Sequence, residues 1–195
     1  MSVFVHFLKW RLGLASAESV TTAAETAILT RHAAGKKRLA EIGVWQGGTT
    51  KRLRAAMASD ATLYAVDPFP KGRLGFSTQR AIATTEVEQL SNGRVVWIRQ
   101  TAAEAATHPE VRDAGAFDFV FLDALHTYEG LREDWETWSP LVAPGGVIAI
   151  HDSRATPDGH SDAVGSVRFT NEVILRDPRF ELAEAVDSLT VLRRR

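Results

Sequence analysis

Two apolar runs of this sequence each end in side chains that can do chemistry. The run FDFVFL leads into Asp123, with His126 three residues further on, and the run VIAI leads into His151 and Asp152. If the runs are neighbouring parallel strands, these side chains meet at the carboxyl edge of one sheet, where open α/β folds bind ligands. Carboxylates there suit a magnesium ion that retains waters. A histidine, whose usual pKa lies near neutrality, suits a general base. The four residues therefore predict metal-assisted activation of a hydroxyl.

A glycine turn upstream predicts a second part of the site. Gly43 and Gly47 allow a tight strand-to-helix turn and close approach of the backbone to a ligand, and the helix from Thr49 aims its amino end there. Glu41 precedes the turn, where an anion would oppose a phosphate but suit a cationic amino acid group. Asp67 ends the next strand candidate, where an acid can accept hydrogen bonds from a ribose diol. Because the spacing is not G-x-G-x-x-G, we expect a nucleoside ligand rather than a pyrophosphate.

Strands and helices must alternate to position these residues. Strand candidates are Arg38–Ile42, Thr62–Val66, Arg94–Ile98, Phe117–Leu122 and Val147–Ile150, followed by a closing hairpin of Phe180–Glu184 and Leu189–Leu192. Helix candidates are Ala15–Ala34, Thr49–Met57, Thr78–Leu90, Ala102–Ala106, Gly130–Trp138 and Ala163–Arg176. This alternation predicts an α/β fold, Rossmann-like, with a mostly parallel sheet covered by helices on both faces. We expect a helical lead-in over residues 1–35 and one domain over residues 36–195.

Composition excludes several classes of protein. The net charge of −1 gives no electrostatic case for a nucleic-acid partner. The absence of cysteine excludes disulfides and a thiol nucleophile, and it is compatible with a cytoplasmic location. No apolar stretch is long enough to span a bilayer, so no integral membrane segment is expected. The apolar segment Val3–Leu14 is expected to form an amphipathic helix that packs on the core or supports a homodimer.

The pattern E-x-G-x-x-x-G, the strand-end acid Asp67 and a later strand ending in Asp123 resemble the class I S-adenosylmethionine-dependent methyltransferases. The resemblance runs from about Lys36 to the C-terminus. It implies a seven-stranded sheet with an antiparallel strand near the C-terminus. It also implies that Gly43 and Gly47 line the methionine part of S-adenosyl-L-methionine, that Asp67 binds the ribose, and that Thr101 and Ala102 border the adenine.

The strings D-A-x-H-x-Y-E and P-G-G-x-I-x-x-H-D resemble a metal-dependent O-methyltransferase subgroup that includes enzymes acting on sugar hydroxyls. The resemblance implies that Asp123 and an acidic pair at positions 151 and 152 bind Mg²⁺, and that His126 is the base. This chain departs from the pattern at His151, which replaces a carboxylate. His151 can ligate the metal through nitrogen, support a ligand, or serve as an alternative base. The expected acceptor is a sugar or oligosaccharide, with a mannoside among the candidates.

Other interpretations remain open. A phenol or catechol is the alternative acceptor, and a Rossmann-type NAD-dependent oxidoreductase is the alternative enzyme, although the glycine spacing and the lack of a Tyr-x-x-x-Lys pair disfavour it. Methylation of nucleic-acid amines is disfavoured because the fourth strand lacks an Asn/Asp-Pro-Pro motif. A non-catalytic module that binds the methyl donor is a further possibility. Arg73, Phe76 and His160 are lid candidates, and Asp134 is expected to be structural.

Overall fold

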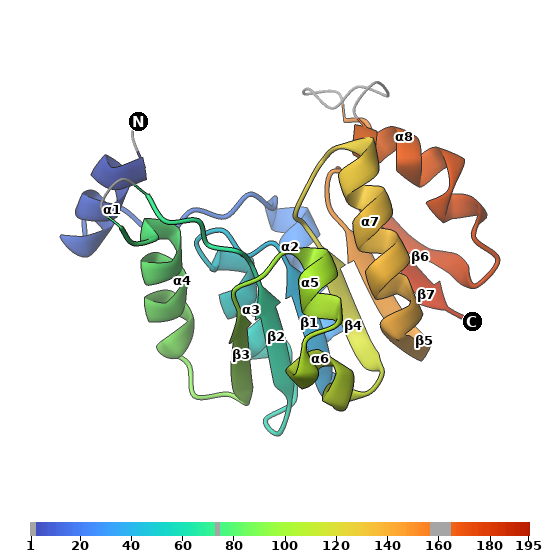
Figure 1. The fold of residues 1–195 in the computed structure, drawn as a ribbon, viewed down its shortest axis with the longest axis horizontal. Helices are drawn as coiled ribbons and strands as arrows, with labels where there is room; N and C mark the ends of the chain where they lie inside the picture. The colour runs from blue at the N-terminus through green and yellow to red at the C-terminus, as the bar shows by residue number, and fades with distance from the viewer. Residues whose placement is uncertain (1–2, 73–74, 157–164) are drawn as a thin grey trace.

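The computed structural model describes residues 3–72, 75–156 and 165–195. Its centre is one seven-stranded sheet in the order β3-β2-β1-β4-β5-β7-β6 (Figure 1). The strands are β1 Arg38–Ile42, β2 Thr62–Val66, β3 Arg94–Ile98, β4 Phe117–Leu122, β5 Val142–Ile150, β6 Phe180–Val186 and β7 Leu189–Arg194. Strands β1 to β5 pair in parallel, and β7 runs antiparallel to both β5 and β6. The predicted Rossmann-like sheet with an antiparallel strand near the C-terminus is confirmed.

Helices cover both faces of the sheet. They are α1 Val3–Arg11, α2 Ala23–Ala33, α3 Gly48–Ala56, α4 Thr78–Glu88, α5 Ala102–Ala106, α6 Pro109–Ala114, α7 Tyr128–Trp138 and α8 Gly165–Glu172, with short 3₁₀ turns at Ser139–Leu141 and Ile174–Arg176. Helices α2 and α3 pack on one face, and α5 to α8 pack on the other. Alternate side chains of β4 enter the two cores, Val120 on one face and Phe121 on the other. Burial on both faces explains why this strand is apolar except at Asp118, near its start, whose carboxylate accepts from the backbone N–H groups of Lys37 and Arg38.

The strand register brings the candidate residues together. Ile42 of β1 is level with Leu122 of β4, and Leu122 is level with Ile150 of β5. The residues that follow these strands therefore meet at one edge, and the backbone N–H of His151 donates to the carbonyl of Leu122 at 3.0 Å. The neighbouring parallel strands expected from the two apolar runs are confirmed.

Several expected boundaries differ from those observed. The long helix predicted from Ala15 is wrong before Ala23, because Thr22 and Glu25 form a capping box that starts α2 there. Strand β5 begins at Val142, earlier than expected, and the residues after Val142 interrupt its register with β4. Helix α6 was not predicted, although Pro109 occupies its first turn as proline commonly does.

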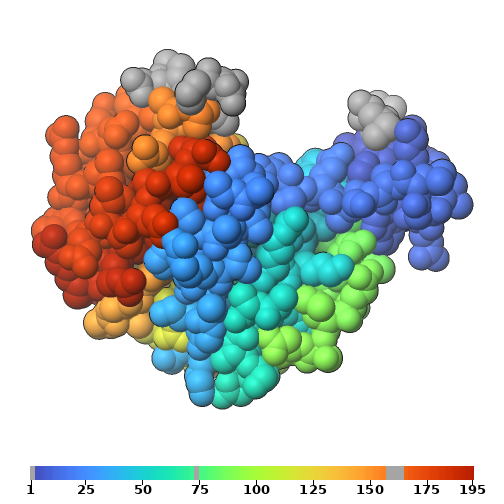
Figure 2. Space-filling view, turned by 180° about the vertical axis from the view of Figure 1, so that it is seen from behind, coloured from blue at the N-terminus to red at the C-terminus, as the bar shows by residue number. Residues whose placement is uncertain are grey.

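The N-terminal helix α1 lies beside α4 at one end of the molecule, and Figure 2 shows this segment, in blue, projecting from the body. The rings of Phe7 and Phe76 are 5.8 Å apart, and the Trp10 indole N–H donates to Glu86 at 2.8 Å. The expected helix therefore exists and packs against α4 and Phe76, while an exposed apolar side remains at Phe4 and Leu8. Within the described ranges, no helix is both long and apolar enough to cross a bilayer.

Candidate active site

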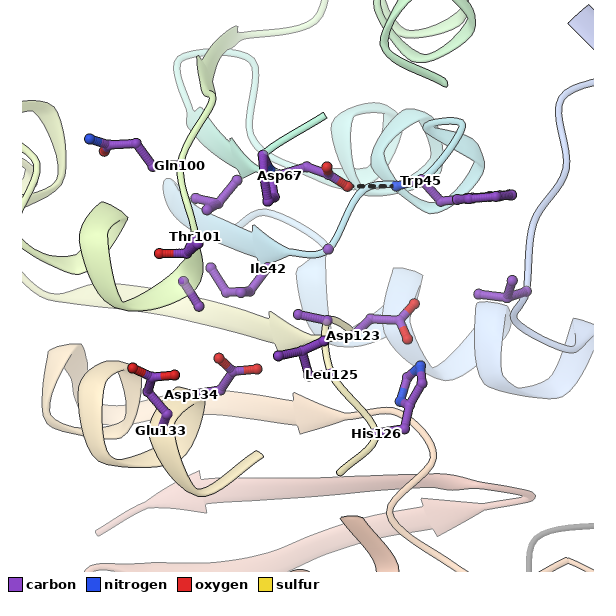
Figure 3. A pocket seen from close by; sticks show the side chains of 16 residues that line it. Ile42, Trp45, Asp67, Gln100, Thr101, Asp123, Leu125, His126, Glu133 and Asp134 are labelled. Carbon is purple, nitrogen blue, oxygen red and sulfur yellow. Dashed lines mark hydrogen bonds between the residues drawn. The ribbon is translucent and has the colours of Figure 1, made fainter. Parts of the chain in front are cut away.

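A cavity of about 610 Å³ opens at the carboxyl ends of β1, β2 and β4 (Figure 3). A second cavity of about 10 Å³, room for about one water molecule, shares part of its wall. The predicted residues that line the larger cavity are Gly43, Asp67, Thr101, Ala102, Asp123 and His126. Those that line the smaller one are Glu41, Gly43, Thr49 and Asp123. The structure thus brings both predicted parts of the site to one place.

The two turn glycines have different structural roles. Gly43 has a φ of 91°, and a Cβ there would lie 2.1 Å from the backbone oxygen of Asp123. Only glycine therefore allows β1 and β4 to approach at the cavity wall. Gly47 has a φ of 77° and caps α3, and a Cβ there would lie 2.9 Å from Cα of Ala83 in α4. Gly47 is not among the residues lining the larger cavity, so it shapes the turn without facing that cavity.

Glu41 is the most deeply buried carboxyl of the site. It is fully buried, and neither side-chain oxygen has a hydrogen-bond partner among the described residues. Burial raises the pKa of Glu41 well above its usual range and outweighs the neighbouring Thr50 hydroxyl, which acts to lower it. The nearby charges of Asp123 and Asp67 raise this pKa further. A buried polar group without a partner is costly. A cation in the adjoining small cavity would supply that partner and favour the ionised form.

Asp67 holds two loops through its carboxylate. One oxygen accepts from the backbone N–H groups of Val44 at 3.1 Å and Trp45 at 3.2 Å, and the other accepts from Phe69 N–H at 2.7 Å. Trp45 and Phe69 both have positive φ, of 54° and 46°, in the left-handed region. Asp67 therefore orders the glycine turn and the loop after β2 together. A carboxylate has about four lone-pair sites, so Asp67 can still accept a bond from a ligand hydroxyl.

Thr101 and Ala102 border the far part of the cavity at the start of α5. The Thr101 hydroxyl is engaged in a capping box with Glu104, so the segment faces a ligand with backbone and methyl groups rather than a free hydroxyl. The indole N–H of Trp138 donates to the Ala102 carbonyl at 3.1 Å. This bond fixes α7 against α5 and sets the width of the cavity between them.

His151 lies behind the cavity wall in a buried ionic cluster. Its Nδ1 is 2.9 Å from Asp123 and its Nε2 is 3.3 Å from Glu25 of α2. Burial acts to lower the pKa of His151, but hydrogen bonds with Asp123 and Glu25 outweigh it and raise the pKa to about 10. Burial acts to raise the pKa of Glu25, but His151, Thr22 and Ser188 lower it to about 2. The cluster is therefore a cationic imidazolium between two carboxylates.

The predicted magnesium site does not fit this arrangement. Because both ring nitrogens of His151 lie within hydrogen-bond distance of carboxylates, neither lone pair is available to a metal ion. One oxygen of Asp123 is paired with the imidazolium of His151. This positive charge lies between Asp123 and Asp152, the carboxylates that a metal ion would need. Among the described residues, no three His, Asp or Glu side chains are arranged to hold an ion together.

His126 faces the cavity from the loop between β4 and α7. Its ring is about half exposed, and its Nδ1 is 3.5 Å from the carboxylate of Asp152. Asp152 has a φ of 47° and is held by its backbone, whose N–H donates to Ser188 Oγ and whose carbonyl accepts from Ser166 Oγ. Figure 3 shows His126 beside Asp123 at the cavity wall. A histidine beside a carboxylate at a cavity wall is an arrangement that suits a general base.

Sequence reasoning missed several residues that build the site. The sequence signal at Glu25 is the capping-box pattern Thr-x-x-Glu, which marks the start of α2 but carries no information about the ion pair with His151. Three exposed apolar side chains line the larger cavity, and the patterns gave no signal for them: Val20, Trp45 and Leu125. Of the lid candidates, Phe76 packs on α1, whereas Arg73 and His160 lie outside the described residues.

A family model described as a methyltransferase domain matches residues 40–153. This span covers more than half of the chain and includes the glycine turn, Asp67, Asp123 and His151. The chain therefore belongs to this methyltransferase family. No curated protein matches the sequence.

Solved structures of low identity share the fold. The O-methyltransferase TomG from Streptomyces achromogenes, in complex with SAM, is 17% identical over 98% of this chain and 87% of its own, with a TM-score of 0.66. An O-methyltransferase from Bacillus cereus in complex with SAH is 19% identical over 96% and 87%, with a TM-score of 0.68. The N-methyltransferase NodS from Bradyrhizobium japonicum is 16% identical over 88% and 93%, with a TM-score of 0.59. The shared fold thus accommodates both oxygen and nitrogen acceptors.

Proposed function

We propose that this methyltransferase uses S-adenosyl-L-methionine to methylate a hydroxyl of a sugar or oligosaccharide. One observation carries the proposal: the residues suited to the donor and the candidate base line one continuous cavity. Gly43, Asp67 and Thr101 lie on its wall together with His126. The two O-methyltransferases of similar fold described above, in complex with SAM and with SAH, agree with this choice.

The groups that line the two cavities suit, one after another, the ammonium group, the ribose and the base of the donor. The unpartnered carboxyl of Glu41 adjoins a cavity large enough for an ammonium group. Asp67, at the end of β2, has lone pairs left for a ribose hydroxyl. The backbone of Thr101 and Ala102 borders the remaining space, which is wide enough for a base. The donor would thus lie along the carboxyl edge with its sulfonium near Asp123.

His126 would take the proton of the acceptor hydroxyl. Asp152, 3.5 Å from Nδ1, favours the tautomer that leaves Nε2 free to accept it. As the oxygen–methyl bond forms, the sulfur–methyl bond breaks, its electron pair stays on sulfur and the hydroxyl proton moves to His126. The protein otherwise contributes alignment of oxygen, methyl carbon and sulfur. No step is assigned to a metal, because the donor set does not fit one.

The acceptor class rests on the D-A-x-H-x-Y-E pattern and on the mouth of the cavity. Trp45 is 40% exposed there and can lie against the apolar face of a sugar ring, while Asp123 and His126 supply hydrogen-bonding groups. A phenolic acceptor is the second candidate. It is favoured by the exposed apolar side chains of Val20 and Leu125 beside Trp45, which would cover a planar ring.

A labelled-methyl transfer screen over monosaccharides, oligosaccharides and catechols tests the proposal. Each reaction is run with added magnesium and with EDTA. We expect label in a hydroxyl product of the carbohydrate set, with similar rates in both conditions. If only the catechols acquire label, the acceptor is a phenol and not a sugar. If EDTA abolishes activity and magnesium restores it, the conclusion that the ionic cluster around His151 does not fit a metal ion is wrong.

A further inference from the structure

Asp134 is a buried carboxyl that the proposed chemistry does not use. It lies on α7 and is 3% exposed, yet it forms part of the wall of the larger cavity. Its carboxyl has no hydrogen-bond or ion-pair partner among the described residues. Figure 3 shows it directed into the cavity, on the side of Ile42 and Thr101. An unpaired buried carboxyl is costly, so its retention calls for a ligand.

Helix α7 places Asp134 opposite Thr101 and Ala102, the segment that would border the adenine of the donor. Trp138, four residues later, shares its helix face and is hydrogen-bonded to the Ala102 carbonyl. The Asp134 carboxyl therefore lies over the same end of the cavity as Ala102. The neighbouring walls come from Ile42, Val66 and Leu125, which are apolar and suit the faces of an aromatic base. Since the Thr101 hydroxyl is engaged in its capping box, the polar side chains left at this end are those of Asp134, Glu133 and Gln100, and Asp134 is the buried carboxyl among them.

We propose that Asp134 binds the adenine of the methyl donor through two hydrogen bonds, donating its O–H to N1 and accepting from the 6-amino group. This inference rests on the proposed function, because it presumes an adenosyl donor. A protonated carboxyl has a donor and an acceptor side by side, which matches the acceptor and donor on that edge of adenine.

The environment of Asp134 favours the protonated form that this contact requires. Burial raises the pKa of Asp134 to about 7, and the charge of Glu133 adds to the rise. The charged or titratable groups that share the cavity wall with Asp134 are Glu133 from α7, Asp67 from the end of β2, and Asp123 and His126 from the end of β4. On α5, Glu104 is occupied by Thr101. The contact should therefore weaken as pH rises above about 7.

Calorimetric titration of S-adenosylhomocysteine at about pH 6 and about pH 8.5 tests this contact. Relative to Asp134→Asn at the same pH, wild-type affinity should fall on the order of tenfold to thirtyfold between the two, because binding must then take up a proton at Asp134. Asp134→Asn keeps a neutral donor and acceptor, so its affinity should be close to the wild-type value at the lower pH, and its own pH dependence reports the other titrating groups of the site, such as Glu41. Asp134→Leu should bind about tenfold to a hundredfold more weakly at the lower pH.

Glu136→Gln is the matched control, because it removes a carboxylate from the exposed side of the same helix. It should reproduce the wild-type pH dependence, and thermal melts establish that each variant is folded. Equal affinities of wild type, Asp134→Asn and Asp134→Leu would overturn the inference, as would a wild-type pH dependence identical to that of Asp134→Asn. A wild-type protein that binds no S-adenosylhomocysteine at either pH would instead overturn the proposed function.

Discussion

Replacing Glu25 by glutamine tests the buried ionic cluster that joins α2 to the sheet. Glu25 is 1% exposed, and its carboxylate accepts from Thr22 N–H at 2.8 Å, from Ser188 N–H at 3.0 Å and from Ser188 Oγ at 2.8 Å. It also lies 3.3 Å from His151 Nε2. Glutamine preserves the size of the side chain but removes its charge. One of its two oxygen positions becomes an amide N–H₂, which cannot accept these bonds.

The expected cost is large because the partner charge remains buried. His151, also nearly buried, would keep only Asp123 and the more distant Asp152 as counter-charges. Breaking a buried ion pair by removing one partner costs about 3–5 kcal/mol. For a chain of this size, that corresponds to a fall in melting temperature of about 6–20 °C.

The pKa shifts of His151 and Glu25 determine how the stability cost of Glu25→Gln changes with pH. Because the pKa of His151 is raised to about 10, its contribution to stability is full below about pH 6.5 and is lost as pH rises through about 10. Because the pKa of Glu25 is lowered to about 2, its contribution is full above about pH 4.5 and is lost as pH falls toward 2. The stability difference between wild type and Glu25→Gln should therefore be greatest from about pH 5 to 7 and shrink toward pH 10.

Urea unfolding of both proteins across this pH range measures the difference. Glu184→Gln is the control, since it removes a partly exposed carboxylate that pairs with Arg31 and His32 of the same helix α2. We expect it to leave the unfolding midpoint nearly unchanged. A Glu25→Gln cost below about 1 kcal/mol, or one that stays constant up to pH 10, would refute the imidazolium between two carboxylates.

Three further predictions concern the cavity. His126→Ala should lower turnover about a hundredfold to ten-thousandfold while the donor dissociation constant, measured by titration, stays unchanged; equal losses would indicate a structural histidine. Gly43→Ala should lower the melting temperature and the donor affinity, because its Cβ would lie 2.1 Å from a backbone oxygen. Gly145→Ala is the control: Gly145 also has positive φ, but a Cβ there has nothing within 4 Å, so this variant should lose only the stability that the strained backbone costs and should keep its donor affinity. Asp67→Asn should weaken donor binding about tenfold or more in calorimetry, since an amide cannot accept all three backbone N–H groups; unchanged affinity would separate Asp67 from the donor site.

The sheet could be predicted from the sequence because its signals are local. Mainly apolar runs such as Phe117–Leu122 reflect burial on both faces, and the helical segments between them indicate parallel pairing. The start of α2 was misplaced because an alanine-rich stretch favours helix along its whole length. The tertiary contacts of Glu25 and its capping bonds to Thr22 instead determine where the helix begins.

Site residues that directly follow a strand could be predicted from the sequence. Site residues whose surroundings depend on contacts with residues far away in the sequence could not. Asp123 and His126 follow β4 directly, so the strand pattern located them. The role of His151 depends on Glu25, 126 residues away in sequence, and no local pattern reports that contact. Asp134 was expected to be structural, because a helix position alone does not tell whether its side chain faces a cavity.

Titration of the purified protein with S-adenosylhomocysteine, beside a parallel titration with a nicotinamide dinucleotide, tests the central claim most directly. We expect saturable binding of S-adenosylhomocysteine to a single site, in the presence of EDTA, and no binding of the dinucleotide. Binding of the dinucleotide without S-adenosylhomocysteine would contradict it and favour an oxidoreductase.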